Sequence, residues 1–387
     1  MIYKLNSDFI KKIFVLIFTT GLIKIFFFIL PYITNSLQFN EFNKMYYTAS
    51  LAAVIGGLGF NYAYAQKRFK IIKVLLFILL NLALIYSILY SIENINSYYS
   101  FIVSFSLIVF ELTSFYLLYN NFIKEYFIVY SILLISYITI VFAAFININL
   151  VIAFSLLTFI ASIISLYFII KIDKRIINGN SKSFYKIGFT AFIINSVSPF
   201  IFIADKFIVN TFFNIETANA YTFAWTLTAP IFYLGVIFEK YIYTLPAGIL
   251  DRKKIILGMI LLFFLLFIYW VIINLFLSFG ITMLPETINL TLLKNIINIM
   301  LPGFMIFAII HYPMNGYLFK KELLNVQYKL SVIYMIIIVL FLILFFILTR
   351  IELNNNYLLI LFLTWGILGI ILLLKYILIK SRNKIEY

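Results

Sequence analysis

The sequence predicts an all-α polytopic membrane protein with about twelve transmembrane helices, arranged as two six-helix lobes around a central cavity. Two observations lead to this fold class. The 387 residues are 65% hydrophobic and only 11% charged, whereas a soluble chain is about a quarter charged. Long uncharged runs also recur along the chain, and each crossing of the hydrocarbon layer needs about 20 apolar residues. This composition excludes a soluble enzyme.

The predicted helices follow the uncharged runs in order. Lys24 interrupts the first run, Glu111 the fourth and the Asp205-Lys206 pair the seventh, while His311 lies in the tenth. The run 126–170 is too long for one crossing, and a tight turn at 145–149 is expected to divide it. The predicted spans are 10–33, 45–66, 74–92, 99–121, 126–146, 149–170, 187–210, 217–240, 255–279, 295–318, 330–349 and 356–379.

The basic residues set the expected orientation. With a cytoplasmic N-terminus, 24 of the 29 Lys and Arg fall on the inner side, and only Lys44, Lys294 and Arg350 fall in outer loops. This asymmetry predicts that both termini are cytoplasmic. The net charge of +15 is then explained by topology and by attraction to an anionic inner leaflet. It does not indicate nucleic-acid binding.

The residue types also limit the chemistry. The chain has no cysteine and one histidine, which excludes disulfides, thiolate metal sites and a cysteine nucleophile. We expect no metal and no cofactor.

A weak internal repeat predicts two halves, residues 1–180 and 181–387. At a shift of 174, Phe39-Asn40 falls on Phe213-Asn214, and Tyr47-Thr48 falls on Tyr221-Thr222. Six helices in each half would give both halves the same membrane orientation, with a path between them. This arrangement is typical of a transporter that works by alternating access.

Two sets of residues carry a resemblance to a known family. The first comprises Leu37–Phe42, Gly56–Phe60 and Arg68, and the second comprises Ala204–Phe207, Ala220–Ala224 and Pro246. They resemble the polysaccharide-exporting flippases of the multidrug/oligosaccharidyl-lipid/polysaccharide superfamily. The first set is similar to that family's first outer loop and second helix. The second set is similar to its helices 7 and 8, with Lys206 in place of the commoner arginine.

The resemblance implies a function. These flippases move undecaprenyl-pyrophosphate-linked oligosaccharide units, for O-antigen, capsule or a related glycan, from the cytoplasmic to the outer leaflet. It implies a bacterial inner-membrane protein, coupling to protons or sodium, and a polymerase and chain-length proteins as pathway partners.

Charged side chains inside spans are costly and are often functional. We expect Lys24, Lys206 and Arg68 to bind the cargo's phosphates, and His311 to contact the sugar or a kinked helix. Alternatively, Lys24 reaches the outer headgroups or pairs with Glu111, and Arg68 serves only to orient the chain.

Glu111 and Asp205 are the candidate ion-coupling carboxylates. An acidic group within a helix bundle can take up and release a coupling ion. The alternative for Glu111 is a buried ion pair that holds helices together. The alternative for Asp205 and Lys206 is a structural role, because the pair lies in the outer third of its predicted helix, where water is near.

Two other functions remain open. A multidrug or cation antiporter of the same superfamily would have the same fold, but Lys24 and Lys206 balance the acidic residues and favour an anionic cargo. A glycan polymerase or ligase is the alternative from another class. The short outer loops, with three Lys or Arg in total, disfavour it.

The mid-span position of Lys24 generates a test. We predict that Lys24→Ala abolishes surface glycan while membrane insertion is retained, because the cargo's pyrophosphate loses its cation. Surface glycan and membrane-inserted protein are measured in the same cells, and normal glycan would remove Lys24 from the site.

Overall fold

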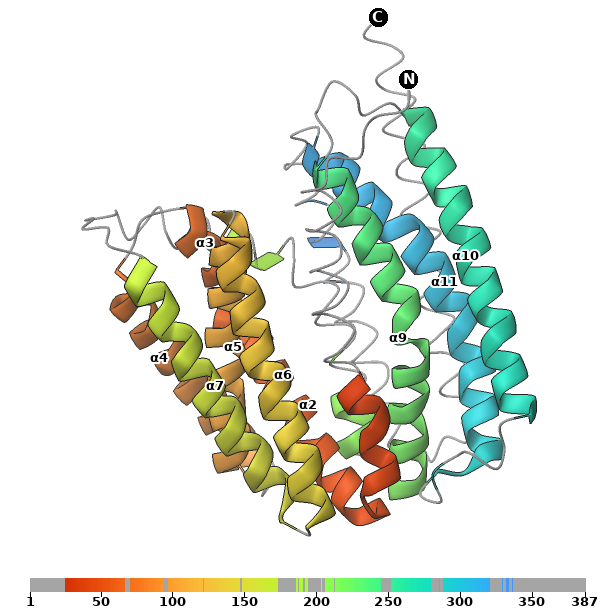
Figure 1. Ribbon diagram of the computed structural model, residues 1–387, viewed down its shortest axis with the longest axis horizontal. Coiled ribbons are helices and arrows are strands. Elements are labelled where there is room, and N and C mark those ends of the chain that lie inside the picture. Colours follow the sequence, from red (N-terminus) through yellow and green to blue (C-terminus); the bar gives the residue numbers. More distant parts are fainter. Residues whose placement is uncertain are drawn as a thin grey trace, which may run out of the picture. The chain divides into compact units, whose positions relative to one another are not determined.

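The computed structural model is helical in all its regular elements within the part of the chain that it describes (Figure 1). The described residues are 25–66, 70–92, 97–120, 122–146, 148–172, 206–211, 213–244, 252–279 and 288–320, with the positions 186, 188–190, 192, 193, 203, 285, 329, 332, 333 and 336. The helices are α2 (Ser36–Gly57), α3 (Phe60–Gln66), α4 (Ile71–Ile92), α5 (Ser97–Tyr119), α6 (Ile123–Phe145), α7 (Leu150–Ile172), α9 (Ile215–Thr244), α10 (Arg252–Phe279) and α11 (Leu290–Lys320).

Six of these helices are long and apolar enough to cross a membrane: Ile71–Tyr90, Tyr98–Leu117, Ile123–Phe145, Leu150–Ile172, Ile256–Ser278 and Leu290–Pro313. Each coincides with a predicted span, which confirms a multi-pass, all-helical membrane protein. Large apolar side chains such as Leu80, Leu84, Leu257 and Phe264 are exposed on α4 and α10, as expected of surfaces solvated by lipid. Of the remaining predicted spans, 45–66 falls on α2 and α3 and 217–240 falls on α9, whereas 10–33, 187–210, 330–349 and 356–379 include many residues outside the described part of the chain.

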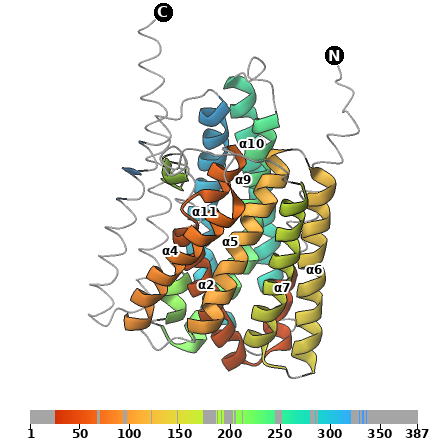
Figure 2. The same cartoon turned by 90° about the vertical axis from the view of Figure 1, so that its left-hand side faces the viewer.

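The predicted turn in the run 126–170 is confirmed. α6 ends at Phe145 and α7 begins at Leu150, and the Asn149 side chain accepts hydrogen bonds from the backbone N–H groups of Val151 and Ile152. This side chain satisfies N–H groups at a helix start that has no preceding turn. α6 and α7 then lie beside each other in both views (Figures 1 and 2).

The predicted single helix 45–66 is wrong in its bounds and its continuity. α2 begins nine residues earlier than expected, at Ser36, because Asn35 and Gln38 form a reciprocal capping box there. α2 ends at Gly57, and a separate short helix, α3, begins at Phe60. Between them Leu58 and Gly59 have φ values of 39° and 65°, a left-handed geometry that ends a right-handed helix.

The repeat register also differs from the predicted one. Asn214 accepts a hydrogen bond from the Thr217 N–H at the start of α9, just as Asn35 does from Gln38 at the start of α2. A shift of 174 would place Asn35 on Val209, so it does not superpose the two helix starts. Phe39 and Asn40 lie within α2, whereas Phe213 and Asn214 precede α9.

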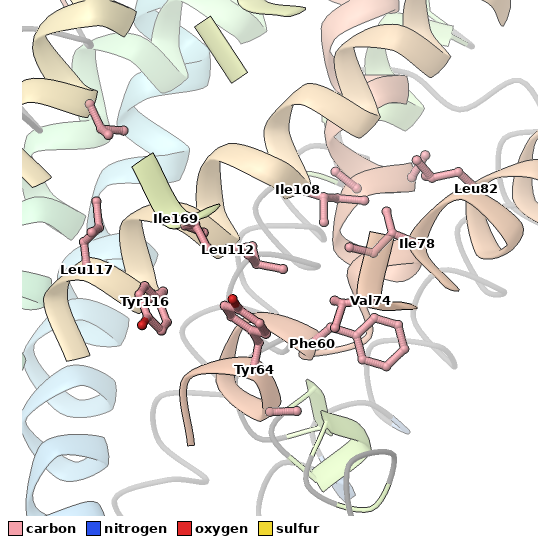
Figure 3. Packing of buried hydrophobic residues seen from close by; sticks show 14 of the residues in the cluster. Phe60, Tyr64, Val74, Ile78, Leu82, Ile108, Leu112, Tyr116, Leu117 and Ile169 are labelled. Carbon is pink, nitrogen blue, oxygen red and sulfur yellow. The ribbon is translucent and has the colours of Figure 1, made fainter. Parts of the chain in front are cut away.

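The chain divides into two compact units, Met1–Asn219 and Ala220–Tyr387. The predicted boundary between residues 180 and 181 lies outside the described residues, so the lobes 1–180 and 181–387 stay a prediction. In the first unit, a core of α3, α4, α5 and α7 side chains surrounds Tyr64 and Tyr116, whose rings lie 5.3 Å apart (Figure 3).

In the second unit, α10 and α11 pack together, and glycines allow close approach between helices. A Cβ at Gly235 of α9 would overlap the Tyr312 ring of α11, and one at Gly258 of α10 would overlap the Phe238 ring of α9. α9 also contains Pro230, which has no N–H to donate to the Thr226 carbonyl in the preceding turn. The Tyr269 hydroxyl of α10 donates to the Leu227 carbonyl in that turn.

Described residues between 188 and 219 contact α2 and α3 in the reverse order of the sequence. Gly188 lies against Leu58, Gly59 and Phe60 at the end of α2. Lys206 lies over Tyr47 in its middle, and Asn219 contacts Ser36 at its start. We call residues 206–219 the crossing segment. Its antiparallel course brings together residues that are up to 183 positions apart.

The approach of Gly188 and Phe192 to Gly59 leaves no room for a side chain at Gly59. This lack of space leads to a prediction. A Cβ at Gly59 would overlap the Gly188 carbonyl oxygen and lie 2.7 Å from the Phe192 nitrogen. We expect Gly59→Ala to lower the free energy of unfolding by about 2–4 kcal/mol, because it adds this clash to a left-handed φ. Thermal unfolding in detergent measures the change.

Gly57→Ala is the matched control. Its Cβ would meet only Ile108 side-chain atoms, at 3.8 Å, and an alanine favours a helix over glycine by about 0.5–1 kcal/mol. Equal effects of the two variants would contradict the assigned break at Gly59.

Candidate functional site

A stripe of polar side chains marks one face of α2. Ser36, Asn40, Asn43 and Tyr47 are spaced by four, three and four residues, which places them on the same side of a helix. Asn40, Asn43 and Tyr47 are each less than one-tenth exposed. We call these four residues the α2 polar face. A buried polar stripe also lies on α7, at Ser155, Thr158, Ser162 and Ser165, but those hydroxyls donate to carbonyls of their own helix.

Lys206 supplies a positive charge to this face. It lies in the helical residues 206–211 and is 9% exposed. Its Nζ lies 5.5 Å from the centroid of the Tyr47 ring, where the negative face of the aromatic ring attracts a cation. Asn210, one turn later, donates to the Lys206 carbonyl at 2.8 Å. The predicted substrate-binding lysine therefore lies beside other polar groups, and its cargo-binding role stays a prediction.

Asn219 joins the crossing segment to the start of α2. Its Nδ2 donates to the Ser36 hydroxyl at 2.9 Å and to the Ser36 carbonyl at 3.2 Å. The Ser36 carbonyl belongs to the first turn of α2, and Asn219 lies in the first turns of α9. The contact therefore holds two helix starts together.

Within the described structure, the buried amide atoms Asn40 Oδ1, Asn43 Nδ2 and Asn219 Oδ1 have no hydrogen-bond partner. Each has less than 1 Å² of accessible surface. Leaving such a group unpaired costs about 1–3 kcal/mol. Sequence reasoning missed these residues because they are neutral, although the spacing of Ser36, Asn40, Asn43 and Tyr47 was a detectable signal.

Glu111 lies on α5 and pairs with an amide at the break between α2 and α3. Its Oε1 accepts from Asn61 Nδ2 at 2.9 Å, and its side chain is exposed. Asn61 follows Gly59 by two residues, so the carboxylate holds the start of α3. The predicted alternative, an ion pair with Lys24, falls on a residue outside the described ones. The ion-coupling role of Glu111 stays a prediction.

His311 belongs to the second unit and packs among aromatic rings of its own helix. It stacks on Phe307 with centroids 4.6 Å apart and meets Tyr312 edge-on at 5.2 Å. The side chain is half-buried in α11, between Pro302 and Pro313. Its proposed contact with substrate stays a prediction.

Three predicted site residues, Lys24, Arg68 and Asp205, lie outside the described part of the chain. Among the residues that are described, no group of three or more His, Cys, Asp or Glu could hold a metal ion. The described site contains the ammonium group of Lys206 beside the Tyr47 phenol ring, the Ser36 hydroxyl and asparagine amides.

The contact between Lys206 and Tyr47 can be measured by a double-mutant cycle. We predict that Tyr47→Leu destabilises the protein more in the wild-type background than in Lys206→Met, with a coupling free energy of about 0.5–2 kcal/mol. Tyr47→Phe keeps an aromatic ring and is the matched control, so it should retain most of the coupling. Zero coupling in detergent unfolding would show that the ring does not stabilise the cation.

Comparisons with known proteins do not place this chain in a family. No family model matches it, and neither a curated protein nor a solved structure is similar to it. The site is therefore assigned from its own residues and geometry.

Proposed function

We propose that this protein is a flippase that moves undecaprenyl-pyrophosphate-linked oligosaccharide units from the cytoplasmic to the outer leaflet by alternating access. The observation that carries the proposal is a buried lysine, Lys206, beside the α2 polar face in a multi-pass membrane protein. The resemblance of Leu37–Phe42 and Ala204–Phe207 to polysaccharide flippases supports the same function.

The chemistry of this site suits the proposed cargo. A pyrophosphate needs a cation. A charged side chain within a membrane span is costly and is often functional, which favours a binding role for Lys206. A sugar head needs polar groups, which Ser36, Asn40 and Asn43 provide in a row. The polyprenyl tail needs only lipid.

The proposed architecture has twelve spans in two lobes, 1–180 and 181–387, in the bacterial inner membrane with both termini cytoplasmic. Six described helices that coincide with predicted spans support the count. The distribution of Lys and Arg supports the orientation. O-antigen and capsule pathways, with their polymerase and chain-length proteins, are the proposed setting.

Glu111 is the proposed ion-coupling residue. Its partner Asn61 lies directly after the helix break at Gly59. A change in the charge of Glu111 would alter the strength of its hydrogen bond to Asn61. It would thereby change how firmly the start of α3 is attached to α5. Binding of a proton or sodium ion can thereby be linked to a movement of the helix pair α2 and α3.

One observation favours a second function, a cation or drug antiporter. The Glu111 carboxylate is exposed in the middle of a span, and an acidic group in such a position can bind a cationic drug. Lys206 argues against this function because it would repel the same cargo. The two functions differ in the sign of charge that the site must accept.

A deletion strain tests the proposal. We expect complete lipid-linked repeat units to accumulate on the cytoplasmic leaflet with no surface polymer, because assembly continues while translocation stops. The measurement is the amount of lipid-linked glycan in each leaflet, with the plasmid-complemented strain as control.

The other outcomes assign the alternatives. Single repeat units that reach the outer face without polymerising would point to a polymerase or ligase. An unchanged leaflet distribution together with increased drug accumulation would point to the antiporter. Either result would overturn the flippase proposal.

A further inference from the structure

We infer that Asn40, Asn43 and Asn219 form a recognition site for the hydroxyl groups of a sugar, which becomes accessible when the crossing segment separates from α2. We call these three residues the amide site. The inference rests on the proposed function for the identity of the cargo. The site itself is argued from geometry and burial.

The first step is the placement of the three residues. Asn40 and Asn43 lie between Ser36 and Tyr47 on one face of α2. The crossing segment contacts both ends of this face, through Asn219 at Ser36 and through Lys206 at Tyr47. Asn40 and Asn43 thus lie between these two contacts along α2. The proposed amide site is between α2 and the crossing segment.

The second step is the cost of leaving these groups unpaired. Buried hydroxyls elsewhere in the unit, such as those of Thr113 and Ser155, donate to carbonyls of their own helix. Asn40 Oδ1, Asn43 Nδ2 and Asn219 Oδ1 have no partner in the described structure. An apolar side chain of the same shape would avoid this penalty. Their presence is explained if a second arrangement of the protein pairs them with a ligand or water.

The third step is the chemistry of the ligand. The unpaired atoms comprise two acceptors and one donor, and a hydroxyl both donates and accepts. A sugar offers several hydroxyls at separations that a row of amides can match. Lys206 at the Tyr47 end adds an attraction for an anionic group on the same molecule. A hydrophobic cation would satisfy neither set of groups.

Separation of the crossing segment can be tested without knowing the cargo. The chain has no cysteine, so a single introduced cysteine is the only thiol. We expect Asn40→Cys and Asn219→Cys to react with a membrane-impermeant maleimide in right-side-out or inverted vesicles. Thr113→Cys is the matched control, because Thr113 is equally buried on α5 and bonds within its own helix. It should stay unlabelled.

Recognition is tested by apolar replacement. We expect Asn40→Leu and Asn43→Leu to raise the melting temperature in detergent by about 2–4 °C each, because an unpaired amide is removed. The same variants should lower surface glycan at least tenfold. Thr113→Val is the control, and it should leave surface glycan unchanged.

The outcomes separate this inference from the proposed function. Absence of labelling at Asn40→Cys and Asn219→Cys would overturn the opening, and stabilised leucine variants with full surface glycan would overturn recognition. If the deletion strain refutes the flippase, labelling of the two cysteines still reports on the opening. If the deletion strain refutes the flippase but both cysteines are labelled, the opening is supported and the identity of the cargo is wrong. Leucine variants that lower the melting temperature would show that the asparagines are structural.

Discussion

The lack of water inside a membrane constrains the buried polar groups of the described helices. Backbone groups are satisfied inside helices, which is why the described elements are helical. Buried hydroxyls follow the same rule, since Thr113 and Ser155 donate to their own helices. Against this background the α2 polar face and the crossing segment are exceptional. They bring a lysine and several amides into one contact, and not every amide atom there is paired.

Close approach between backbones occurs at the break between α2 and α3. Gly59 and Gly188 lack side chains, so the chain around residue 188 can lie directly on the break between α2 and α3. Small residues have this role in membrane proteins because packing, not the hydrophobic effect, holds helices together there. The same break places Asn61 beside Glu111. One irregular point in the backbone thus lies against Gly188 and, through Asn61, beside the Glu111 carboxylate.

Parts of the site could be predicted from sequence and parts could not. Lys206 and Glu111 stand out because a charge within an apolar run needs a reason. Asn40, Asn43 and Asn219 did not stand out, since neutral residues near a predicted loop carry no such signal. Asn40 and Asn43 were also assigned to an outer loop that proved to be the first turns of α2. Their importance comes from a contact between positions 183 residues apart, which periodicity along one segment cannot reveal.

The sequence by itself determined the fold class, six of the spans and the turn between α6 and α7, because hydrocarbon burial and helix length act on each segment separately. Only the tertiary structure decided that the predicted helix 45–66 is broken at Gly59, and which side of α2 is covered by the crossing segment. The physical reason is that a left-handed residue and a helix partner are selected by packing against distant parts of the chain. Local composition cannot encode a neighbour such as Asn219, which lies 183 positions along the chain from Ser36.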